Sequence, residues 1–339
     1  MILDRKTLES ILTGALEFGW ENNGLAPERF TAAQRANIRE RSVEQPRDMA
    51  SVALDFYTDA RWIRLEAGTR KERKVFVFDL LEDGVLTASV QSVMPEEGDV
   101  PFVTVEFPLT EGEKRVTLYL PWDRAARIRR VELPDGASVR PYVHRRSFVA
   151  FGDSITHGCY AAHPSMTYVS QLARLLDARV INQGIGGEFM CPDNLTPGTY
   201  PRFDFVTIAY GTNDYRHGTR EEFDREMPEF LRRAAAEFPN TPIFVILPLW
   251  RLQEGQGKIW EMGRTLEEVR SCIRQEAAKY PNMYLVEGAK LVPHLPEFYG
   301  DKFLLHPNDL GFGQYAMNLY REILPVLERQ EKRHVTEQK

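Results

Sequence analysis

Two rhythms of hydrophobic and polar residues divide the chain near residue 145. In the first part, short runs rich in β-branched and aromatic residues recur about every ten positions and are separated by Gly, Asp, Glu or Pro. This rhythm is typical of an antiparallel β-sandwich. A short amphipathic helix is expected over 7–18, and the polar stretch 20–41 is ambiguous. The predicted strands are 51–56, 62–65, 74–79, 84–86 with the residues that follow, 102–107, 115–120 and 127–132.

In the second part, apolar strands alternate with long helical segments. Five such strands separated by helices predict a parallel sheet covered on both faces, whose ligands bind outside the carboxyl ends of the strands. The expected strands are 147–151, 179–182, 205–210, 243–247 and 283–286, and the expected helices are 166–176, 220–238, 265–279 and 310–329. The predicted organisation is therefore a β-sandwich domain with a short leading helix (1–145), an α/β domain (146–332) and a polar tail (333–339).

Composition narrows the class of protein. The chain has 339 residues, of which 43% are hydrophobic and 27% charged, as in ordinary globular proteins. A net charge of -6 argues against a nucleic-acid partner. Three scattered cysteines make neither a disulfide framework nor a metal array. Because no segment reads as a secretory signal or a membrane span, we expect a cytoplasmic protein without a membrane partner, and an oligomer is left open.

Polar motifs lie at the ends of the predicted parallel strands. The first strand stops at Gly152-Asp153-Ser154, which is one way to expose a nucleophilic hydroxyl but also makes an ordinary turn. The second strand runs into a loop with Gly184, Gly186 and Gly187, whose backbone N–H groups can approach a ligand closely. The same loop is also explained as a flexible strand-to-helix connection.

Two further polar groups complete a possible site. The third strand ends in Tyr210-Gly211-Thr212-Asn213-Asp214, and His306-Pro307 precedes the last helix. Taken alone, Asn213 and His306 are explained as helix-capping or surface residues. Together with Ser154 they supply what ester hydrolysis by serine requires: a nucleophile, a base and donors to the oxyanion. The predicted donors are the N–H groups of Ser154 and Gly187 and the Asn213 side chain, and no metal or cofactor is needed.

These ordered motifs resemble the blocks of the SGNH (GDSL-type) hydrolases. The resemblance covers about 148–327 and implies a flavodoxin-like three-layer fold with serine esterase chemistry. It implies the same roles for Ser154, Gly187, Asn213 and His306, with Gly186 as the less favoured glycine donor. The sandwich in front is similar in pattern to the N-terminal accessory domain of some carbohydrate-esterase-like members.

One position departs from the family pattern. The family carries Asp-x-x-His, in which the carboxylate orients the histidine, whereas the residue three before His306 is Phe303. Asp301 can take this role only if the loop bulges by two residues. Otherwise Ser154 and His306 form a dyad, and a backbone carbonyl or Glu297 orients the ring.

Residues near the predicted site are candidates for substrate contacts. Trp250 and Arg251 follow the fourth parallel strand, and His157 follows the nucleophile. Each is explained equally well by packing of its loop. Cys159 lies near Ser154, but no base is evident for it.

The hypothesis is therefore a serine esterase that hydrolyses a small acyl ester, with acetyl as the candidate acyl group and a carbohydrate as the candidate alcohol. Two alternatives remain. One is an acyltransferase that uses the same acyl-enzyme, and the other is a catalytically silent carbohydrate-binding protein on a hydrolase scaffold.

Overall fold

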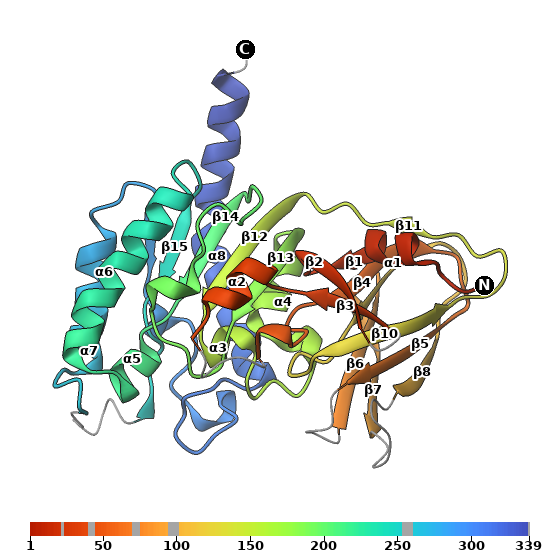
Figure 1. Ribbon diagram of the computed structural model, residues 1–339, viewed down its shortest axis with the longest axis horizontal. Coiled ribbons are helices and arrows are strands. Elements are labelled where there is room, and N and C mark those ends of the chain that lie inside the picture. The colour runs from red at the N-terminus through yellow and green to blue at the C-terminus, as the bar shows by residue number, and fades with distance from the viewer. Residues whose placement is uncertain (22–23, 40–44, 70–74, 94–101, 253–259, 338–339) are drawn as a thin grey trace.

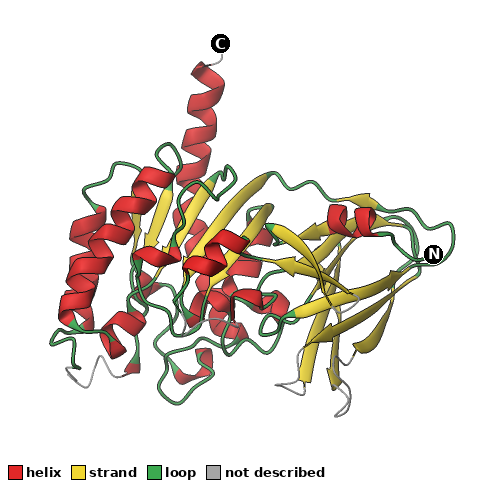
Figure 2. Cartoon of the chain, viewed as in Figure 1, coloured by secondary structure: helices red, strands yellow, loops and turns green. Residues whose placement is uncertain are grey.

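The computed structural model describes residues 1–21, 24–39, 45–69, 75–93, 102–252 and 260–337. Antiparallel sheets make up its N-terminal half, and a parallel sheet with helices makes up the rest, as Figure 2 shows. This confirms the predicted fold class. The division at 145/146 remains a prediction; it falls between two strands, β11 (Arg140–Pro141) and β12 (Arg146–Gly152).

The N-terminal half is a sandwich of two sheets around one core. The alternation of buried Val103, Val105 and Phe107 with exposed neighbours shows how its strands turn one face inward. One sheet has the order β1 (Leu12–Thr13), β4 (Ala53–Thr58), β9 (Lys114–Tyr119), β6 (Val75–Glu82) and β7 (Val85–Val93), with β11 on β4. The other has the order β2 (Glu17–Glu21), β3 (Gly24–Glu28), β10 (Ala126–Glu132), β5 (Trp62–Thr69) and β8 (Phe102–Pro108).

One expectation for the N-terminal segment needs correction, and a stretch left ambiguous is resolved. The first helix, α1 (Arg5–Ile11), ends well before residue 18, because Leu12 and Thr13 pair with Leu54 and Ala53 of β4. The ambiguous stretch contains β2, β3 and the short helix α2 (Ala32–Asn37), followed by a 3-10 turn η2 (Gln45–Arg47). Helical spacing of apolar residues was misleading here because pairing with a sheet edge took precedence over local pattern.

The parallel sheet has the order β13 (Ala178–Gly184), β12, β14 (Phe205–Ala209), β15 (Ile243–Ile246) and β16 (Met283–Val286). Numbered along this half of the chain, the order is 2-1-3-4-5, the flavodoxin-like arrangement. Every predicted strand of this half is present. The order in which strands are added to the sheet reverses between β12 and β14, so the loops after these two strands flank the place at the carboxyl edge where this fold binds ligands.

Helices cover both faces of this sheet (Figure 1). Successive residues of β12 point to opposite faces: Phe148 and Ala150 pack with α4 (Tyr168–Leu175) and α8 (Asp309–Glu337), and Val149 and Phe151 pack with α6 (Arg220–Glu237) and α7 (Leu266–Ala277). Two shorter helices, α3 (Ser154–His157) and α5 (Thr212–His217), follow β12 and β14. The described residues of this half also contain the 3-10 turns η3 (Pro164–Met166), η4 (Pro192–Asn194), η6 (Gly288–Lys290) and η7 (Pro296–Phe298).

The last helix is longer than expected. Its backbone continues from Asp309 to Glu337 and extends beyond the rest of the molecule in Figure 1, so most of the predicted tail 333–339 is helical; residues 338–339 lie outside the described part. Among the helices of the described residues, none has both the length and the apolar composition of a membrane span.

Candidate active site

Ser154 is the first residue of α3, at the carboxyl end of β12. The turn into this helix is tight, because a Cβ at Gly152 would lie 2.0 Å from Thr156 Oγ1. Asp153 caps the helix by accepting a hydrogen bond from the Ile155 N–H, and Gly158 ends it in the left-handed conformation with φ of 113°. Ser154 is only 8% exposed, so its hydroxyl is held in a fixed place.

The loop before α8 brings His306 to the serine. Ser154 Oγ lies 2.8 Å from His306 Nε2, and His306 Nδ1 lies 2.9 Å from Asp301 Oδ2. A carboxylate only accepts hydrogen bonds, so Nδ1 carries the proton and Nε2 is the acceptor for the serine hydroxyl. This is the tautomer in which histidine can act as a base toward serine.

The backbone of residues 301–306 forms the bulge that this contact requires. Leu304 has φ of 48°, a left-handed conformation that is uncommon for a non-glycine residue. The Asp301 carboxylate also accepts the N–H groups of Phe303 at 2.7 Å and of His306 at 2.7 Å. Phe303 itself points outward, 47% exposed. The side chain next to His306 Nδ1 is therefore that of Asp301, and not that of Phe303 or Glu297.

The electrostatics of Asp301 follow from these contacts. Burial alone would raise the pKa of this carboxyl. The hydrogen bonds from the His306 ring, the His306 N–H and the Phe303 N–H outweigh burial and hold the pKa below its usual value. Asp301 is therefore ionised at neutral pH. Its negative charge lies next to Nδ1 of His306, where it can stabilise the imidazolium that forms when His306 takes a proton.

The glycine-rich loop after β13 lies beside the same serine turn. The Gly186 N–H donates to Gln45 Oε1, whereas Gly187 has φ of 80° and open space where a Cβ would be. Because the Gly186 donor is already engaged with the N-terminal half, Gly187 is the better candidate for an oxyanion donor. The role of Gly187 as a donor remains a prediction.

Asn213, which follows the third parallel strand β14, contacts this loop. Asn213 Nδ2 donates to the carbonyl of Glu188 at 2.9 Å, and Glu188 directly follows Gly187. An amide nitrogen has two hydrogens, so one fixes the side chain against the loop and the other can serve an oxyanion. The contact keeps the two predicted donors of the loop and of α5 in register.

The predicted substrate contacts have packing partners of their own. His157 is 3% exposed, with Nε2 at 3.2 Å from Asp48 Oδ2 and its ring edge-on to Trp122. Trp250 stacks on His294 with ring centroids 4.4 Å apart. Arg251 is buried, with its guanidinium 5.7 Å from the centre of the Tyr215 ring. All three residues therefore have neighbours within the protein, and their role in binding remains a prediction.

The model of a known protein family matches the part of the chain that holds these residues. The model of the GDSL-like lipase/acylhydrolase family matches residues 150–313, a range that holds Ser154, Gly187, Asn213 and the loop 301–306. Residues 150–313 form a GDSL-like lipase/acylhydrolase domain. This makes the chain an enzyme that acts on carboxylic acyl esters.

Solved structures resemble the GDSL-like domain together with the sandwich. The salicylyl-acyltransferase SsfX3 from a tetracycline biosynthetic pathway has a TM-score of 0.75 at 21% identity, over 93% of this chain and 94% of that one. A putative GDSL-like lipase from Bacteroides ovatus has a TM-score of 0.74 at 19% identity, over 95% and 97%. A family two carbohydrate esterase from Clostridium thermocellum, in complex with cellohexaose, has a TM-score of 0.64 at 16% identity, over 94% and 99%. No curated protein sequence matches this chain.

One residue of the GDSL-like site escaped the sequence analysis. The ring of Tyr160 stacks on that of His306, with centroids 5.0 Å apart and planes at 20°, and the tyrosine is 52% exposed. Tyr160 has φ of 73° and lies against Gly300, where a Cβ would come within 2.7 Å of its own Cβ. Nothing in the local sequence signals this stacking, because both partners come from the far loop 300–306.

Two buried carboxyl groups lie behind the GDSL-like site. Burial raises the pKa of Asp153 to about 6 and that of Asp214 to about 7. Asp214 accepts the Met190 N–H with both oxygens, at 3.1 and 3.2 Å, and so ties α5 to the loop after β13. Among the described residues, no group of three or more His, Cys, Asp or Glu side chains is arranged to hold a metal ion.

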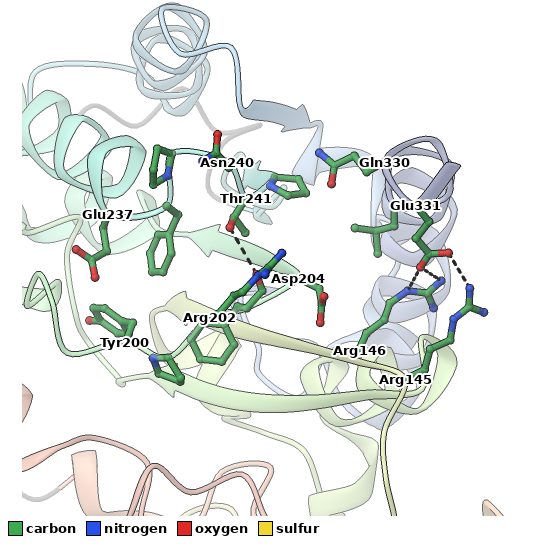
Figure 3. Close-up of a pocket in the computed structure, with 16 residues that line it drawn as sticks. Arg145, Arg146, Tyr200, Arg202, Asp204, Glu237, Asn240, Thr241, Gln330 and Glu331 are labelled. Atoms are coloured by element: carbon green, nitrogen blue, oxygen red, sulfur yellow. Dashed lines mark hydrogen bonds and ion pairs between the residues drawn. The ribbon is translucent and has the colours of Figure 1, made fainter. Parts of the chain in front are cut away.

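A large cavity of the C-terminal half lies away from this site. It has a volume of about 800 Å³ at the amino ends of the parallel strands, where Arg146 begins β12 and Asp204 precedes β14 (Figure 3). Arg145 and Arg146 both pair with Glu331 of α8 across its rim. None of the predicted site residues lines it.

Proposed function

We propose that this enzyme hydrolyses a small acyl ester through an acyl-enzyme on Ser154. His306 Nε2 takes the hydroxyl proton as Ser154 Oγ attacks the ester carbonyl. The N–H groups of Ser154 and Gly187 and the Asn213 amide bind the oxyanion that develops. His306 then protonates the leaving alcohol and activates a water molecule that releases the acid. Asp301 holds the ring in the required tautomer and stabilises the imidazolium.

One observation carries the proposal: the continuous chain of contacts from Ser154 Oγ through both nitrogens of His306 to Asp301. Each contact has the length of a good hydrogen bond. It also removes the main argument for a silent binding protein, which was the missing aspartate of Asp-x-x-His.

The proposed substrate is an acetyl ester, with an O-acetylated carbohydrate as the candidate alcohol. The likeness of 94% of this chain, sandwich included, to a carbohydrate esterase in complex with cellohexaose supports this choice. An exposed aromatic ring, Tyr160, lies next to the base, where the alcohol part of an ester leaves. Comparing initial rates on acetylated sugars and on a series of longer aryl esters tests the choice; a preference for long acyl chains would contradict it.

The nucleophile is tested by Ser154→Ala. Loss of the attacking oxygen is expected to lower kcat on 4-nitrophenyl acetate by roughly 10³-fold or more, since binding and the remaining donors leave only residual catalysis. Circular dichroism should show an unchanged fold. In parallel, a fluorophosphonate probe should label the native chain at Ser154 and leave the variant unlabelled, as read by mass spectrometry. Near-native turnover by the variant would overturn the assignment.

Acyl transfer is the second candidate, favoured by the likeness to a salicylyl-acyltransferase. Hydrolysis and transfer share the acyl-enzyme and differ only in whether water or a second alcohol attacks it. Product analysis with and without an added sugar acceptor separates them. Acylated acceptor in excess over free acid would favour transfer.

A further inference from the structure

A segment of the N-terminal half contacts both the loop that carries the Gly187 donor and the helix that begins with the Ser154 donor. It comprises η2 and the turn after it, residues 45–51, and is anchored by Arg29. Its contacts with the GDSL-like domain converge on two places, the glycine-rich loop after β13 and the helix α3 that begins with Ser154. We call residues 45–51 with Arg29 the support segment.

Arg29 fixes the support segment to the end of β13. Its guanidinium has no exposed surface and donates to the backbone carbonyls of Gln45 at 2.8 Å, of Gly184 at 3.3 Å, and of Asp48 and Asn182. Burial lowers the pKa of Arg29 to about 10, which still leaves it charged at neutral pH. Burying a charge in this way is costly unless its donors are satisfied, so the four carbonyls are held in a definite arrangement around it.

Gln45 continues this arrangement into the loop itself. Its side-chain oxygen accepts the Gly186 N–H at 2.5 Å, one residue before the proposed donor at Gly187. Glycine residues do not fix their own backbone angles, and Gly187 in particular has open space around its missing Cβ. The Gln45 acceptor therefore restrains the peptide between Ile185 and Gly186, which directly precedes the peptide that carries the Gly187 N–H. It acts together with the hydrogen bond from the Glu188 N–H to the Ile185 carbonyl and that from Asn213 to the Glu188 carbonyl.

The same segment also contacts the nucleophile helix. Asp48 Oδ2 lies 3.2 Å from His157 Nε2 in α3. Asn182, whose carbonyl receives Arg29, donates from its side chain to the Thr156 carbonyl at 2.8 Å and to Ser51 Oγ at 3.3 Å. The support segment thus contacts both elements whose backbones carry the Ser154 and Gly187 donors.

We propose that Gln45 and Arg29 are positioning residues that hold the glycine-rich loop in the conformation that presents the Gly187 N–H to the oxyanion. The inference rests on the proposed role of Ser154 and gives the N-terminal half a part in catalysis that is independent of substrate binding. Oxyanion donors act only when they are aimed before the reaction at the place where charge develops, so a loop of glycines needs such support.

The test is Gln45→Met, which keeps the length of the half-buried side chain and removes the acceptor. We expect kcat on 4-nitrophenyl acetate to fall about 10- to 100-fold, less than the 10²–10³ typical for loss of a whole donor, with KM changed less than about two-fold. Inhibition by phenylboronic acid, whose serine adduct resembles the tetrahedral intermediate, should weaken in parallel with kcat/KM. Gln45→Glu, which retains an acceptor for the Gly186 N–H, should keep kcat within about five-fold of the native value.

Tyr142→Phe is the matched control. It removes another hydrogen bond between the two halves, from Tyr142 to Asp177 at 2.9 Å, next to the amino end of β13 and so at the opposite end from the loop. It should leave kcat and boronic acid inhibition unchanged. Thermal unfolding of every variant measures the purely structural effect.

Two results separate the possible failures. If Ser154→Ala is inactive but Gln45→Met retains native kcat and native boronic acid inhibition, the positioning role is wrong and the proposed function stands. If Ser154→Ala is active, the proposed function itself fails. A fall in kcat that Gln45→Glu and Tyr142→Phe share equally, in step with their melting temperatures, would show a general loss of stability and also overturn the positioning role.

Discussion

The imidazole of His306 has a defined neighbour on each of its functional sides. Ser154 Oγ contacts one nitrogen, Asp301 contacts the other, and the ring of Tyr160 covers a face. The contacts at the two nitrogens determine which of them carries the proton, and the stacking on Tyr160 limits how far the imidazole can tilt. Each contact makes a separate prediction about turnover.

Asp301→Asn tests the contact at Nδ1. An amide can donate to Nδ1 and so stabilise the tautomer that cannot accept the serine proton, and it carries no charge to stabilise the imidazolium. We expect kcat to fall roughly 10²- to 10⁴-fold with a small change in KM, measured by steady-state kinetics on an aryl acetate. Glu297→Gln is the control and should retain native kcat, because Glu297 is exposed and meets the site only through its backbone carbonyl, which accepts from Asn308. Equal activity of Asp301→Asn and the native enzyme would favour a dyad.

Tyr160→Ala tests the contact with the ring face. The electron-rich face of tyrosine attracts the imidazolium that forms in the transition state, an interaction of about 0.5–2 kcal/mol. Its removal should lower kcat roughly 3- to 30-fold. Tyr160→Phe keeps the face and should retain most of the activity, so a large loss in this variant would instead point to a role of the phenolic hydroxyl.

At the scale of elements, the site depends on how closely α3 approaches β13. A Cβ at Gly184 would lie 2.3 Å from the backbone nitrogen of His157, and backbone cannot yield as a flexible side chain can. The end of β13 therefore sets the position of α3, and with it that of Ser154.

Gly184→Ala should displace α3 and the serine with it. We expect kcat to fall at least 10-fold and the protein to lose roughly 1–3 kcal/mol of stability, the range for overpacking. Kinetics and urea unfolding measure the two effects. Gly19→Ala in β2 is the matched control, because its Cβ would make only an ordinary contact of 3.7 Å with Ala26, and both properties should stay close to native. A fully active Gly184→Ala enzyme would show that the approach of α3 to β13 does not matter.

At the scale of the whole molecule, stability should depend on the buried acids behind the site. Burial raises the pKa of Asp153 to about 6 and of Asp214 to about 7, well above the usual value of about 4 in an unfolded chain. Between about pH 4 and about pH 7, these two carboxyl groups bind more protons in the folded state than in the unfolded state. The free energy of unfolding should therefore decrease as pH rises from about 4 to about 7, as far as these two groups are concerned.

Asp214→Asn isolates this effect. The amide oxygen can still accept the Met190 N–H, but the side chain no longer has to ionise in a buried place. Relative to the native protein, the variant should gain roughly 1–4 kcal/mol between pH 4.5 and pH 7.5, as measured by urea unfolding at several pH values. A difference between the two proteins that does not change with pH would contradict the raised pKa of Asp214.

The sequence determined by itself the architecture and the chemistry at the strand ends. The alternation of apolar and polar residues in the first part, and the apolar strands between helices in the second, are local patterns. They can be read from neighbouring residues because a strand buried on one face alternates and a strand buried on both faces is continuously apolar. Since the carboxyl ends of parallel strands meet at one edge, Ser154, the glycine-rich loop and Asn213 could also be grouped from order alone. The first helix was overextended because a short helical pattern does not reveal that Leu12 and Thr13 pair with β4.

Only the tertiary structure decided what surrounds these groups. From the sequence, Asp301 was a candidate only if the loop bulged by two residues, and the left-handed backbone at Leu304 that brings Asp301 to the ring cannot be read from Lys302-Phe303-Leu304. The stacking of Tyr160, and the contacts of Arg29 and Gln45 with the loop after β13, join residues that are distant in sequence. The physical reason is that hydrophobic periodicity records which face of an element is buried, whereas the partner of a polar group is fixed by how whole elements pack.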